Sequence, residues 1–324
     1  MDNIIEIRNL TIQYKTDERI VEAVNRLNLT LAHGESLGLV GETGAGKTTT
    51  ALGIMGLIPD PPGIVTEGEI IFEGEDLLKM GKSKLRTVRG KKISMIFQDP
   101  MTSLNPVVSV GDQIAESIRI HEKLSRADAT IKAKEMLELV GIPGDRYAEY
   151  PHQFSGGMKQ RVIIAIALSC NPKLLLADEP TTALDVTIQA QVLDLIAKLK
   201  KEQNTSMILI THDLGVVVEV CDKVAIMYAG EIVEYGTLTQ IYDNTCHPYT
   251  KGLFGSIPDL ESKANRLSPI PGLMPDPANL PEGCSFEPRC TYSCGRCKTN
   301  DPHMVEVEAG HFVKCFNFIK GGRE

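Results

Sequence analysis

The feature that most constrains the fold is a glycine-rich loop between a short apolar run and a helix-forming stretch. The apolar run covers residues 37–40, and the helix-forming stretch covers residues 48–55. In a strand–loop–helix unit, glycines let backbone N–H groups converge on phosphate oxygens at the positive end of the helix. A glycine-rich turn with an incidental lysine is the alternative, which this context disfavours. The loop matches the pattern G-x-x-x-x-G-K-[ST] and reads Gly41, Glu42, Thr43, Gly44, Ala45, Gly46, Lys47 and Thr48.

The loop predicts a site for a nucleotide and Mg²⁺, and a second acidic segment completes it. Lys47 is expected to neutralise the β- and γ-phosphate oxygens, and the Thr48 hydroxyl to bind Mg²⁺. The apolar residues 174–177 end in Asp178 and Glu179. One carboxylate at a strand end can hold the metal, and an adjacent one can polarise the attacking water. We therefore expect Asp178 to bind Mg²⁺ and Glu179 to act as the general base.

Apolar runs alternate with amphipathic segments through most of the chain, which indicates an α/β fold. Residues 187–202, for example, place their apolar side chains on one helical face. The apolar runs do not alternate with polar residues, as expected of strands buried on both sides in a largely parallel sheet. The runs expected to form strands are residues 4–7, 37–40, 69–72, 93–97, 174–177, 207–210 and 223–227.

The character of the sequence changes twice, and these changes suggest a domain organisation. Residues 106–170 are expected to form a mostly helical insertion, with two helices within residues 110–140. After residue 236 prolines become frequent, which favours extended and turn conformations. We predict a nucleotide-binding domain over residues 1–236 and a Pro- and Cys-rich extension over residues 237–324.

Composition excludes several classes of protein. A hydrophobic content of 42% is too high for an intrinsically disordered chain. The net charge of −8 argues against a nucleic-acid binder that works by bulk electrostatics. No apolar run approaches the length of about 18 residues that a membrane-spanning helix needs. The N-terminus lacks a basic region followed by an apolar run, so we expect no secretory signal and a cytoplasmic protein.

Four further segments lie along the chain: Gln98, residues 155–157, residues 183–185 and His212. Together with the glycine-rich loop, they resemble the motifs of ATP-binding-cassette (ABC) ATPases. They occur in the order found in that family, and Met158 stands where the commonest signature sequence has Gln. The resemblance implies an α/β P-loop NTPase fold, the ABC nucleotide-binding domain, with a helical subdomain at about residues 106–170. The matching residues are Gln98 for the Q-loop, Ser155, Gly156 and Gly157 for the signature sequence, Ala183, Leu184 and Asp185 for the D-loop, and His212 for the switch histidine.

The resemblance also implies roles for single residues. The signature residues would bind ATP held by the partner subunit, so that ATP is sandwiched between two chains. Tyr14 would stack on adenine, and an ordinary strand aromatic is the alternative for this position. The implied catalytic residues are Lys47, Gln98, Glu179 and His212; the implied Mg²⁺ ligands are Thr48, Gln98 and Asp178; and Thr49 and Asp185 join residues 41–48 as nucleotide contacts.

Other segments narrow the resemblance to the oligopeptide and dipeptide importers. These are residues 97–106, 150–153 and 247–250, and the tail segment 270–290. The signature form Phe-Ser-Gly-Gly-Met looks like that of the first of the two paired ATPase subunits in such importers. The resemblance therefore implies an ATP-hydrolysing subunit that energises peptide uptake as two ABC domains close on ATP and reopen after hydrolysis.

The importer resemblance implies partners and a location. The partners would be a second ABC ATPase subunit or a second copy of this chain, two integral-membrane permease subunits and, indirectly, an extracytoplasmic peptide-binding protein. The chain would lie at the cytoplasmic side of the cell membrane, and no nucleic-acid partner is expected. A nickel or other small-solute importer is the nearest alternative. A soluble ABC ATPase, and a regulatory iron–sulfur protein that binds nucleotide without hydrolysing it, are more remote.

Five of the eight cysteines lie between residues 284 and 315. In a cytosolic protein, such a cluster indicates metal or redox chemistry before structural disulfides. Four thiolates suit Zn²⁺ or an iron–sulfur cluster, and a metal would help a Pro-rich tail to fold; free thiols are the remaining alternative. The family resemblance implies a [4Fe–4S] cluster held by Cys284, Cys290, Cys297 and Cys315, with Cys294 as a possible substitute for Cys297.

Overall fold

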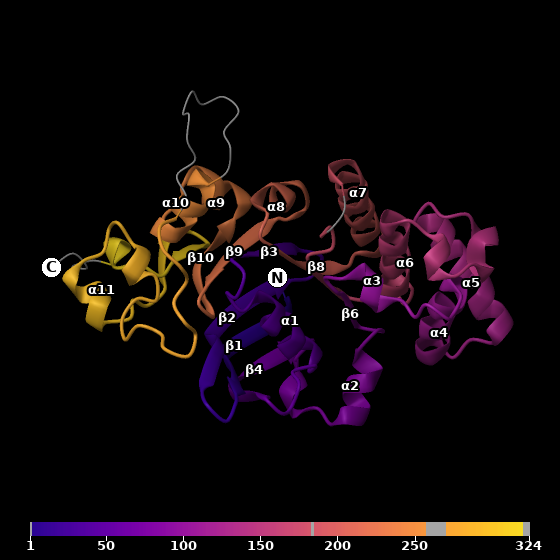
Figure 1. The fold of residues 1–324 in the computed structure, drawn as a ribbon, viewed down its shortest axis with the longest axis horizontal. Coiled ribbons are helices and arrows are strands. Elements are labelled where there is room, and N and C mark those ends of the chain that lie inside the picture. Colours follow the sequence, from indigo (N-terminus) through magenta and orange to yellow (C-terminus); the bar gives the residue numbers. More distant parts are fainter. Residues whose placement is uncertain (1, 183–184, 257–269, 320–324) are drawn as a thin grey trace. The chain divides into compact units, whose positions relative to one another are not determined.

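The computed structural model describes residues 2–182, 185–256 and 270–319 (Figure 1). The chain forms two compact units. The units interleave along the sequence, so each is described by itself. The boundary expected after residue 236 stays a prediction. The first unit comprises Met1–Glu6, Thr30–Leu37 and Ile71–Val220, and the second comprises Ile7–Leu29, Gly38–Ile70 and Cys221–Glu324.

Three parallel strands lie side by side in the first unit: β6 (Ile93–Ile96), β7 (Leu174–Asp178) and β8 (Ser206–Thr211). β7 lies between the other two and pairs in parallel with both. Every residue of these strands is buried, as their continuous apolar runs predict. Because the carboxyl ends of parallel strands meet at one edge, the residues that follow β6 and β8 come close to the end of β7.

The helical insertion belongs to the first unit and begins with two capped helices, α4 (Val110–Glu122) and α5 (Arg126–Leu139). The hydroxyl oxygens of Ser109 and Ser125 each accept the backbone N–H three residues later, at 3.2 and 3.1 Å, which satisfies a free donor of the first turn. This confirms the prediction of two helices within residues 110–140. The remaining elements of this unit are β5 (Glu75–Asp76), α2 (Lys82–Val88), α3 (Pro100–Ser103), α6 (Gly156–Leu168), α7 (Val186–Gln203), α8 (Leu214–Val220) and the 3₁₀ helices at Leu77–Lys79, Gly144–Ala148 and Pro151–Gln153.

The second unit is built mainly from antiparallel strands. β9 (Lys223–Tyr228) and β10 (Glu231–Thr237) form a hairpin whose two-residue turn, Ala229 and Gly230, has φ of 47° and 86°. Such a short turn allows only antiparallel pairing, because parallel strands need a crossover of about a dozen residues or more. The expectation of a largely parallel sheet therefore holds for β6–β8 but not for these strands.

Elements from both ends of the chain complete the second unit. Its helices begin with α1 (Lys47–Met55), which directly follows the glycine-rich loop. The long strands β1 (Asn3–Lys15), β2 (Ile20–Ala32) and β4 (Gly63–Phe72) lie mostly in this unit, and β3 (Ser36–Val40) is divided between the units after Leu37. The C-terminal elements are α9 (Leu238–Asp243), α10 (Pro248–Gly255), α11 (Gly295–Thr299), β11 (Val305–Glu308), β12 (His311–Val313) and the 3₁₀ helices at Glu287–Arg289 and Phe316–Phe318.

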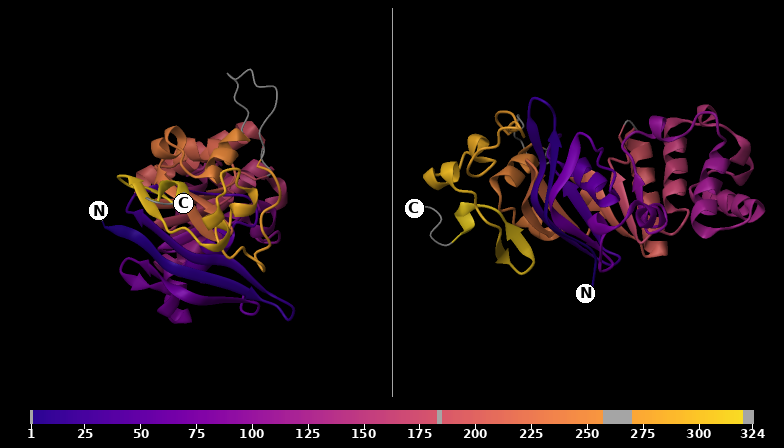
Figure 2. Two further views of the ribbon diagram at one scale, coloured as in Figure 1. Left: turned by 90° about the vertical axis from the view of Figure 1, so that its left-hand side faces the viewer. Right: turned by 90° about the horizontal axis from the view of Figure 1, so that it is seen from below.

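The C-terminal extension is integrated into the second unit by backbone pairing. β12 pairs with β10 and β11 pairs with β12, both antiparallel. The N–H of Glu22 in β2 donates to the carbonyl of Pro277 at 3.0 Å, and Figure 2 shows the yellow C-terminal part of the chain beside the indigo N-terminal strands. Among the described residues, no helix combines the length and apolar character needed to span a bilayer.

A fully buried carboxylate fastens the extension to β10. The Glu234 side chain, 0% exposed, accepts the backbone N–H groups of Cys246 at 2.7 Å and His247 at 3.0 Å. Its third partner is the ring Nε2 of His311, at 2.9 Å. A buried carboxylate is costly unless it is hydrogen-bonded. The fold therefore needs these three partners in place, which fixes the course of the chain after β10.

Candidate nucleotide-binding site

The glycine-rich loop of residues 41–48 follows β3 and leads into α1 within the second unit. Gly46, the residue just before α1, has φ of 101°, a conformation that favours glycine. A Cβ atom at Gly46 would lie 2.2 Å from the carbonyl oxygen of Ala23, and one at Gly41 would lie 2.2 Å from that of Met227. Both glycines are therefore required by close backbone approach.

The Lys47 side chain turns back and binds the backbone of its own loop. Its ammonium group donates to the carbonyl oxygens of Gly41 at 2.6 Å and Glu42 at 3.0 Å, and the residue is 6% exposed. Thr48 is exposed and Thr49 is half-buried. Gly46, the residue just before α1, makes no side-chain cap hydrogen bond, and the N–H groups at the start of a helix are the donors that an anion can use.

In the first unit, three predicted site residues come together at the carboxyl ends of β6, β7 and β8. Gln98 Nε2 donates to Glu179 Oε2 at 2.9 Å, and His212 Nδ1 lies 3.0 Å from Glu179 Oε1. The Thr182 hydroxyl also donates to Oε2, at 2.9 Å. Asp178, the last residue of β7, is 2% exposed. The arrangement holds the Glu179 carboxylate in one orientation, as a general base requires.

The backbone at Glu179 is strained. Its φ is 45°, in the left-handed region that a non-glycine residue adopts only at a cost of about 1–3 kcal/mol. Its N–H donates to the carbonyl of Ile210 in the neighbouring strand at 2.8 Å, which helps to impose this conformation. Strain of this kind is concentrated at functional sites.

The signature segment begins α6. Ser155 precedes the helix and its hydroxyl oxygen accepts the N–H of Met158 at 3.4 Å, so this hydroxyl serves as the helix cap. Gly157 packs against α7, because a Cβ atom there would lie 2.6 Å from Ile188 Cγ2. Asp185, which is exposed, caps α7 by accepting the N–H of Ile188 at 3.0 Å. The D-loop residues Ala183 and Leu184 lie outside the described residues.

Tyr14 lies near the end of β1 and is half-buried. Its ring edge lies at the start of β4, just after the turn that precedes this strand, since a Cβ atom at Gly63 would lie 3.0 Å from Tyr14 Cε1. The N–H of Lys15 also donates to the carbonyl of Pro62 at 2.8 Å, which joins β1 to the same turn. The expected stacking of Tyr14 on adenine stays a prediction.

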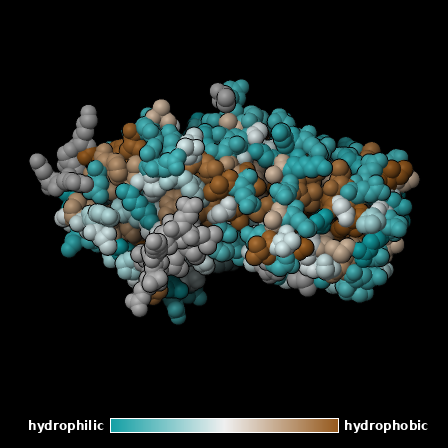
Figure 3. All heavy atoms as spheres, turned by 90° about the horizontal axis from the view of Figure 1, so that it is seen from above, coloured by the Kyte–Doolittle hydropathy of each residue, from teal (hydrophilic) through white to brown (hydrophobic). Residues whose placement is uncertain are grey.

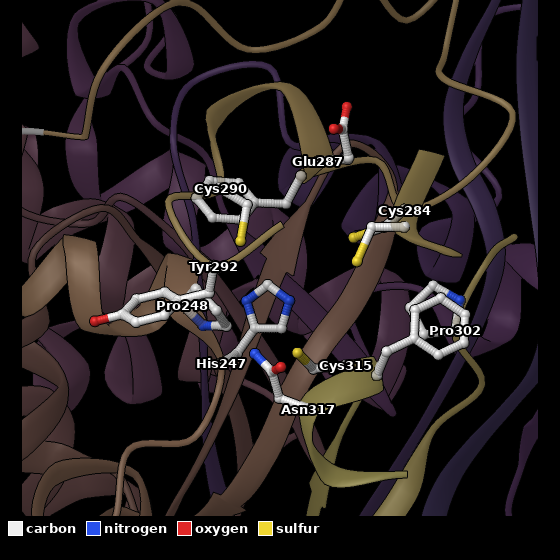
Figure 4. Close-up of a pocket in the computed structure, with 12 residues that line it drawn as sticks. His247, Pro248, Cys284, Glu287, Cys290, Tyr292, Pro302, Cys315 and Asn317 are labelled. Carbon is white, nitrogen blue, oxygen red and sulfur yellow. The ribbon is translucent and has the colours of Figure 1, made fainter. Parts of the chain in front are cut away.

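The cysteines of the C-terminal extension line a small cavity in the second unit. Figure 4 shows the sulfur atoms of Cys284, Cys290 and Cys315 around a common space, with the His247 ring beside it. Cys297 is the fourth cysteine of the lining. Cys294 is not part of the lining, and its sulfur lies 3.3 Å from that of Cys297.

Burial controls the chemistry of this cavity. It raises the pKa of Cys284 to about 12 and that of Cys297 to about 11, and it also raises the pKa of Cys290 and Cys315. Burial lowers the pKa of His247 to about 3, so its ring is neutral. A bound cation would reverse the effect on the thiols by stabilising the thiolates. Four thiols facing one cavity therefore fit a thiolate-bound metal or iron–sulfur cluster.

Two residues of the extension contact the glycine-rich loop, and neither was assigned a role from the sequence. The Arg289 guanidinium makes a two-point ion pair with the Glu42 carboxylate, at 2.6 and 3.1 Å. The N–H of Glu42 donates to the Tyr249 hydroxyl at 2.9 Å. These partners are 247 and 207 positions apart in the chain. No local pattern in the sequence signals contacts of this range.

Comparisons with known proteins identify the family. A family described as ABC transporter matches residues 24–182, and one described as Oligopeptide/dipeptide transporter, C-terminal region, matches residues 233–297. The oligopeptide transport ATP-binding protein OppD of Bacillus subtilis (strain 168) is 52% identical, over 96% of this chain and 88% of its own. The dipeptide transport ATP-binding protein DppD of the same organism is 47% identical, over 98% and 95%.

A solved structure gives the same result for the fold. The dimeric structure of the ATP-binding cassette MJ0796 in a post-hydrolysis state, bound to ADP and Pi, is 28% identical with a TM-score of 0.65. The similarity covers 72% of this chain and 98% of that one. The predicted α/β P-loop fold of an ABC ATPase is thereby confirmed. The chain belongs to the ABC transporter family, among the ATP-binding proteins of its oligopeptide/dipeptide transporter branch.

Proposed function

We propose that this chain is the ATP-hydrolysing subunit of an importer of di- or oligopeptides. The observation that carries the proposal is the Glu179 carboxylate, held between Gln98 and His212 in the way that a general base for water attack must be held. The printed names of the relatives, which are oligopeptide and dipeptide transport ATP-binding proteins, support the peptide cargo.

The proposed mechanism divides phosphate binding and hydrolysis among the predicted residues. Residues 41–48 and the first turn of α1 bind the triphosphate, with Lys47 against the β- and γ-phosphates. Thr48, Gln98 and Asp178 hold Mg²⁺. Glu179 accepts a proton from the attacking water. Asp185 contacts nucleotide, and the signature residues before and within α6 act on the ATP of a partner ATPase subunit, so that ATP binding closes the pair and hydrolysis reopens it.

The closing and reopening of the two ATPase subunits is proposed to be transmitted to two integral-membrane permeases. Large apolar side chains of the helical insertion support the proposal, since Val107, Ile120 and Ile131 are 79%, 65% and 58% exposed. A surface recess beside Ile120 adds a second feature suited to docking. Figure 3 shows apolar side chains scattered among hydrophilic ones on the protein surface. The subunit would thus work at the cytoplasmic side of the membrane.

Transport in reconstituted vesicles tests the proposal. The chain is combined with its two permeases, its sister ATPase and the binding protein, and labelled dipeptides, tetrapeptides and nickel are supplied in turn. We expect ATP-dependent accumulation of peptide, and none with Glu179→Gln. Accumulation of nickel alone would support the small-solute alternative. Full ATP hydrolysis without any association with membrane subunits would support a soluble ATPase.

We also propose that the cysteine cavity holds a [4Fe–4S] cluster through Cys284, Cys290, Cys297 and Cys315. When bound, the cluster would act chiefly as a cross-link between segments of the Pro-rich extension. Iron and sulfide analysis of anaerobically purified protein tests this. Cys297→Ser should lose iron, while the matched control Cys294→Ser should retain it, because Cys294 is not part of the cavity lining. Stoichiometric zinc without iron contradicts the cluster and supports a zinc site.

A further inference from the structure

An acidic residue lies in the loop that is built to bind a triphosphate. Glu42 follows Gly41 in that loop, and its side chain is 33% exposed. A carboxylate close to the phosphates of a nucleotide repels them, and the repulsion is stronger near a protein surface than in bulk water. A triphosphate site that contains this residue therefore needs a nearby positive charge to neutralise it, and the proposed function assigns the charge of Lys47 to the phosphates.

Arg289 supplies that charge from the C-terminal extension. Its guanidinium pairs with both carboxylate oxygens of Glu42, a fork geometry that fixes orientation as well as charge. The Arg289 side chain is only 5% exposed, so solvent screens the pair weakly. Its Nε also donates to the carbonyl of Pro271 at 2.9 Å, and its guanidinium lies 5.8 Å from the centre of the Tyr228 ring. The cation is thus held in place by the unit that surrounds it.

Two further contacts from the same extension reach the loop. The Tyr249 hydroxyl accepts the backbone N–H of Glu42, and its ring is fully buried against those of Tyr228 and Phe286, with ring centres 4.6 and 5.4 Å away. A Cβ atom at Gly44 would lie 3.0 Å from the methyl carbon of Met274. The extension therefore contacts the Glu42 side chain, the Glu42 backbone N–H and the surface of the loop at Gly44.

We propose that Arg289 is a positioning residue for the nucleotide: it neutralises Glu42 and fixes the phosphate-binding loop, so that the C-terminal extension sets the affinity for nucleoside triphosphate. The inference rests on the proposed nucleotide-binding function of this loop. Arg289 acts through Glu42 and does not itself touch the phosphates.

A double-mutant cycle tests this relation. Titration calorimetry measures the affinity of the full chain for MgATP and MgADP in wild type, Arg289→Gln, Glu42→Gln and the double variant. We expect Arg289→Gln to weaken MgATP binding roughly tenfold, less for MgADP, because the phosphate-binding loop then carries an unneutralised carboxylate. In the Glu42→Gln background the same substitution should change affinity less than about twofold. An equal loss in both backgrounds overturns the proposal.

Two controls separate this effect from damage to the fold. Arg26→Gln also removes an arginine–carboxylate contact to the extension, with Asp301 at 3.3 Å, but does not involve the loop, and should leave MgATP affinity unchanged. Arg289→Lys keeps the charge and should bind MgATP more tightly than Arg289→Gln; equal weakness contradicts neutralisation. Hydrogen exchange of residues 41–48 should rise in Arg289→Gln. If wild type binds no MgATP, the proposed function fails; if wild type and Arg289→Gln bind equally, only this inference fails.

Discussion

At the residue scale, the proposed hydrolysis mechanism depends on the Glu179 carboxylate. Replacement by glutamine keeps the size of the side chain and its capacity to hydrogen-bond Gln98, but removes the group that accepts a proton. We expect steady-state phosphate release to fall roughly 10²–10⁴-fold, the usual contribution of a general base, while ATP binding is retained. Malachite-green phosphate assays and fluorescent-nucleotide binding measure the two quantities. Normal hydrolysis in Glu179→Gln would refute the assignment.

Glu73 shows how a single carboxylate contributes to stability in a pH-dependent way. It pairs with Lys92 at 2.7 Å and with Lys173, the residues that precede β6 and β7, and its side chain is 20% exposed. Burial raises the pKa of Glu73. Hydrogen bonds and charge from Lys173 and Lys92 lower the pKa by more than burial raises it, so the net shift is downward from 4.5. A carboxylate whose pKa is lowered by folding stabilises the fold at pH values above its ordinary pKa. This contribution is lost as the pH falls through the lowered pKa.

The corresponding substitution is Glu73→Gln. We expect it to reduce the free energy of unfolding by about 1 kcal/mol or less at pH 7, because both lysines are substantially exposed to solvent. The difference from wild type should shrink as pH falls below 4.5 and disappear once the pH is below the lowered pKa of Glu73. Urea denaturation at pH 7 and at acidic pH measures both values. A difference that stays constant across this range contradicts the electrostatic explanation.

At the scale of elements, α6 and α7 meet where the signature segment begins. An alanine at Gly157 would place its Cβ 2.6 Å from Ile188 Cγ2. Overpacking costs about 1–3 kcal/mol, which exceeds the gain of at most about 1 kcal/mol from replacing glycine by alanine in a helix. We therefore expect Gly157→Ala to lower the midpoint of urea unfolding. The loss of stability caused by Gly157→Ala should be smaller in an Ile188→Ala background. If Gly157→Ala is as stable as wild type, the close packing of Gly157 against Ile188 is contradicted.

The elements also show which parts of the fold could be predicted from the sequence. β6, β7 and β8 are continuous apolar runs, α4 and α5 begin at capping serines, and the residues that follow the three strands meet because parallel strands share an edge. Residues 231–237 were not among the runs expected to form strands, and an apolar run alone does not distinguish the two directions of pairing, so the antiparallel hairpin of β9 and β10 was not predicted. The addition of β12 to β10 and the contact between Arg289 and Glu42 depend on long-range packing, which leaves no periodic signal in the sequence.

At the scale of the whole molecule, the extension carries two features on one short segment. Arg289, which holds the glycine-rich loop, directly precedes Cys290, and Phe286 lines the cysteine cavity while packing against Tyr249. If a metal orders the cavity, it also orders the segment that positions Arg289. Binding at the two sites would then be coupled, and the coupling free energy would be reciprocal.

The coupling is tested by comparing metal-loaded and metal-free protein. We expect removal of the metal to weaken MgATP binding roughly fivefold or more in wild type, the lower end of ordinary coupling between sites. In Arg289→Gln it should have little further effect, because the link to Glu42 is already broken. Cys294→Ser serves as the matched control and should behave like wild type, since Cys294 does not line the cavity. Equal MgATP affinity in loaded and metal-free wild type would show that the cavity serves only the folding of the extension.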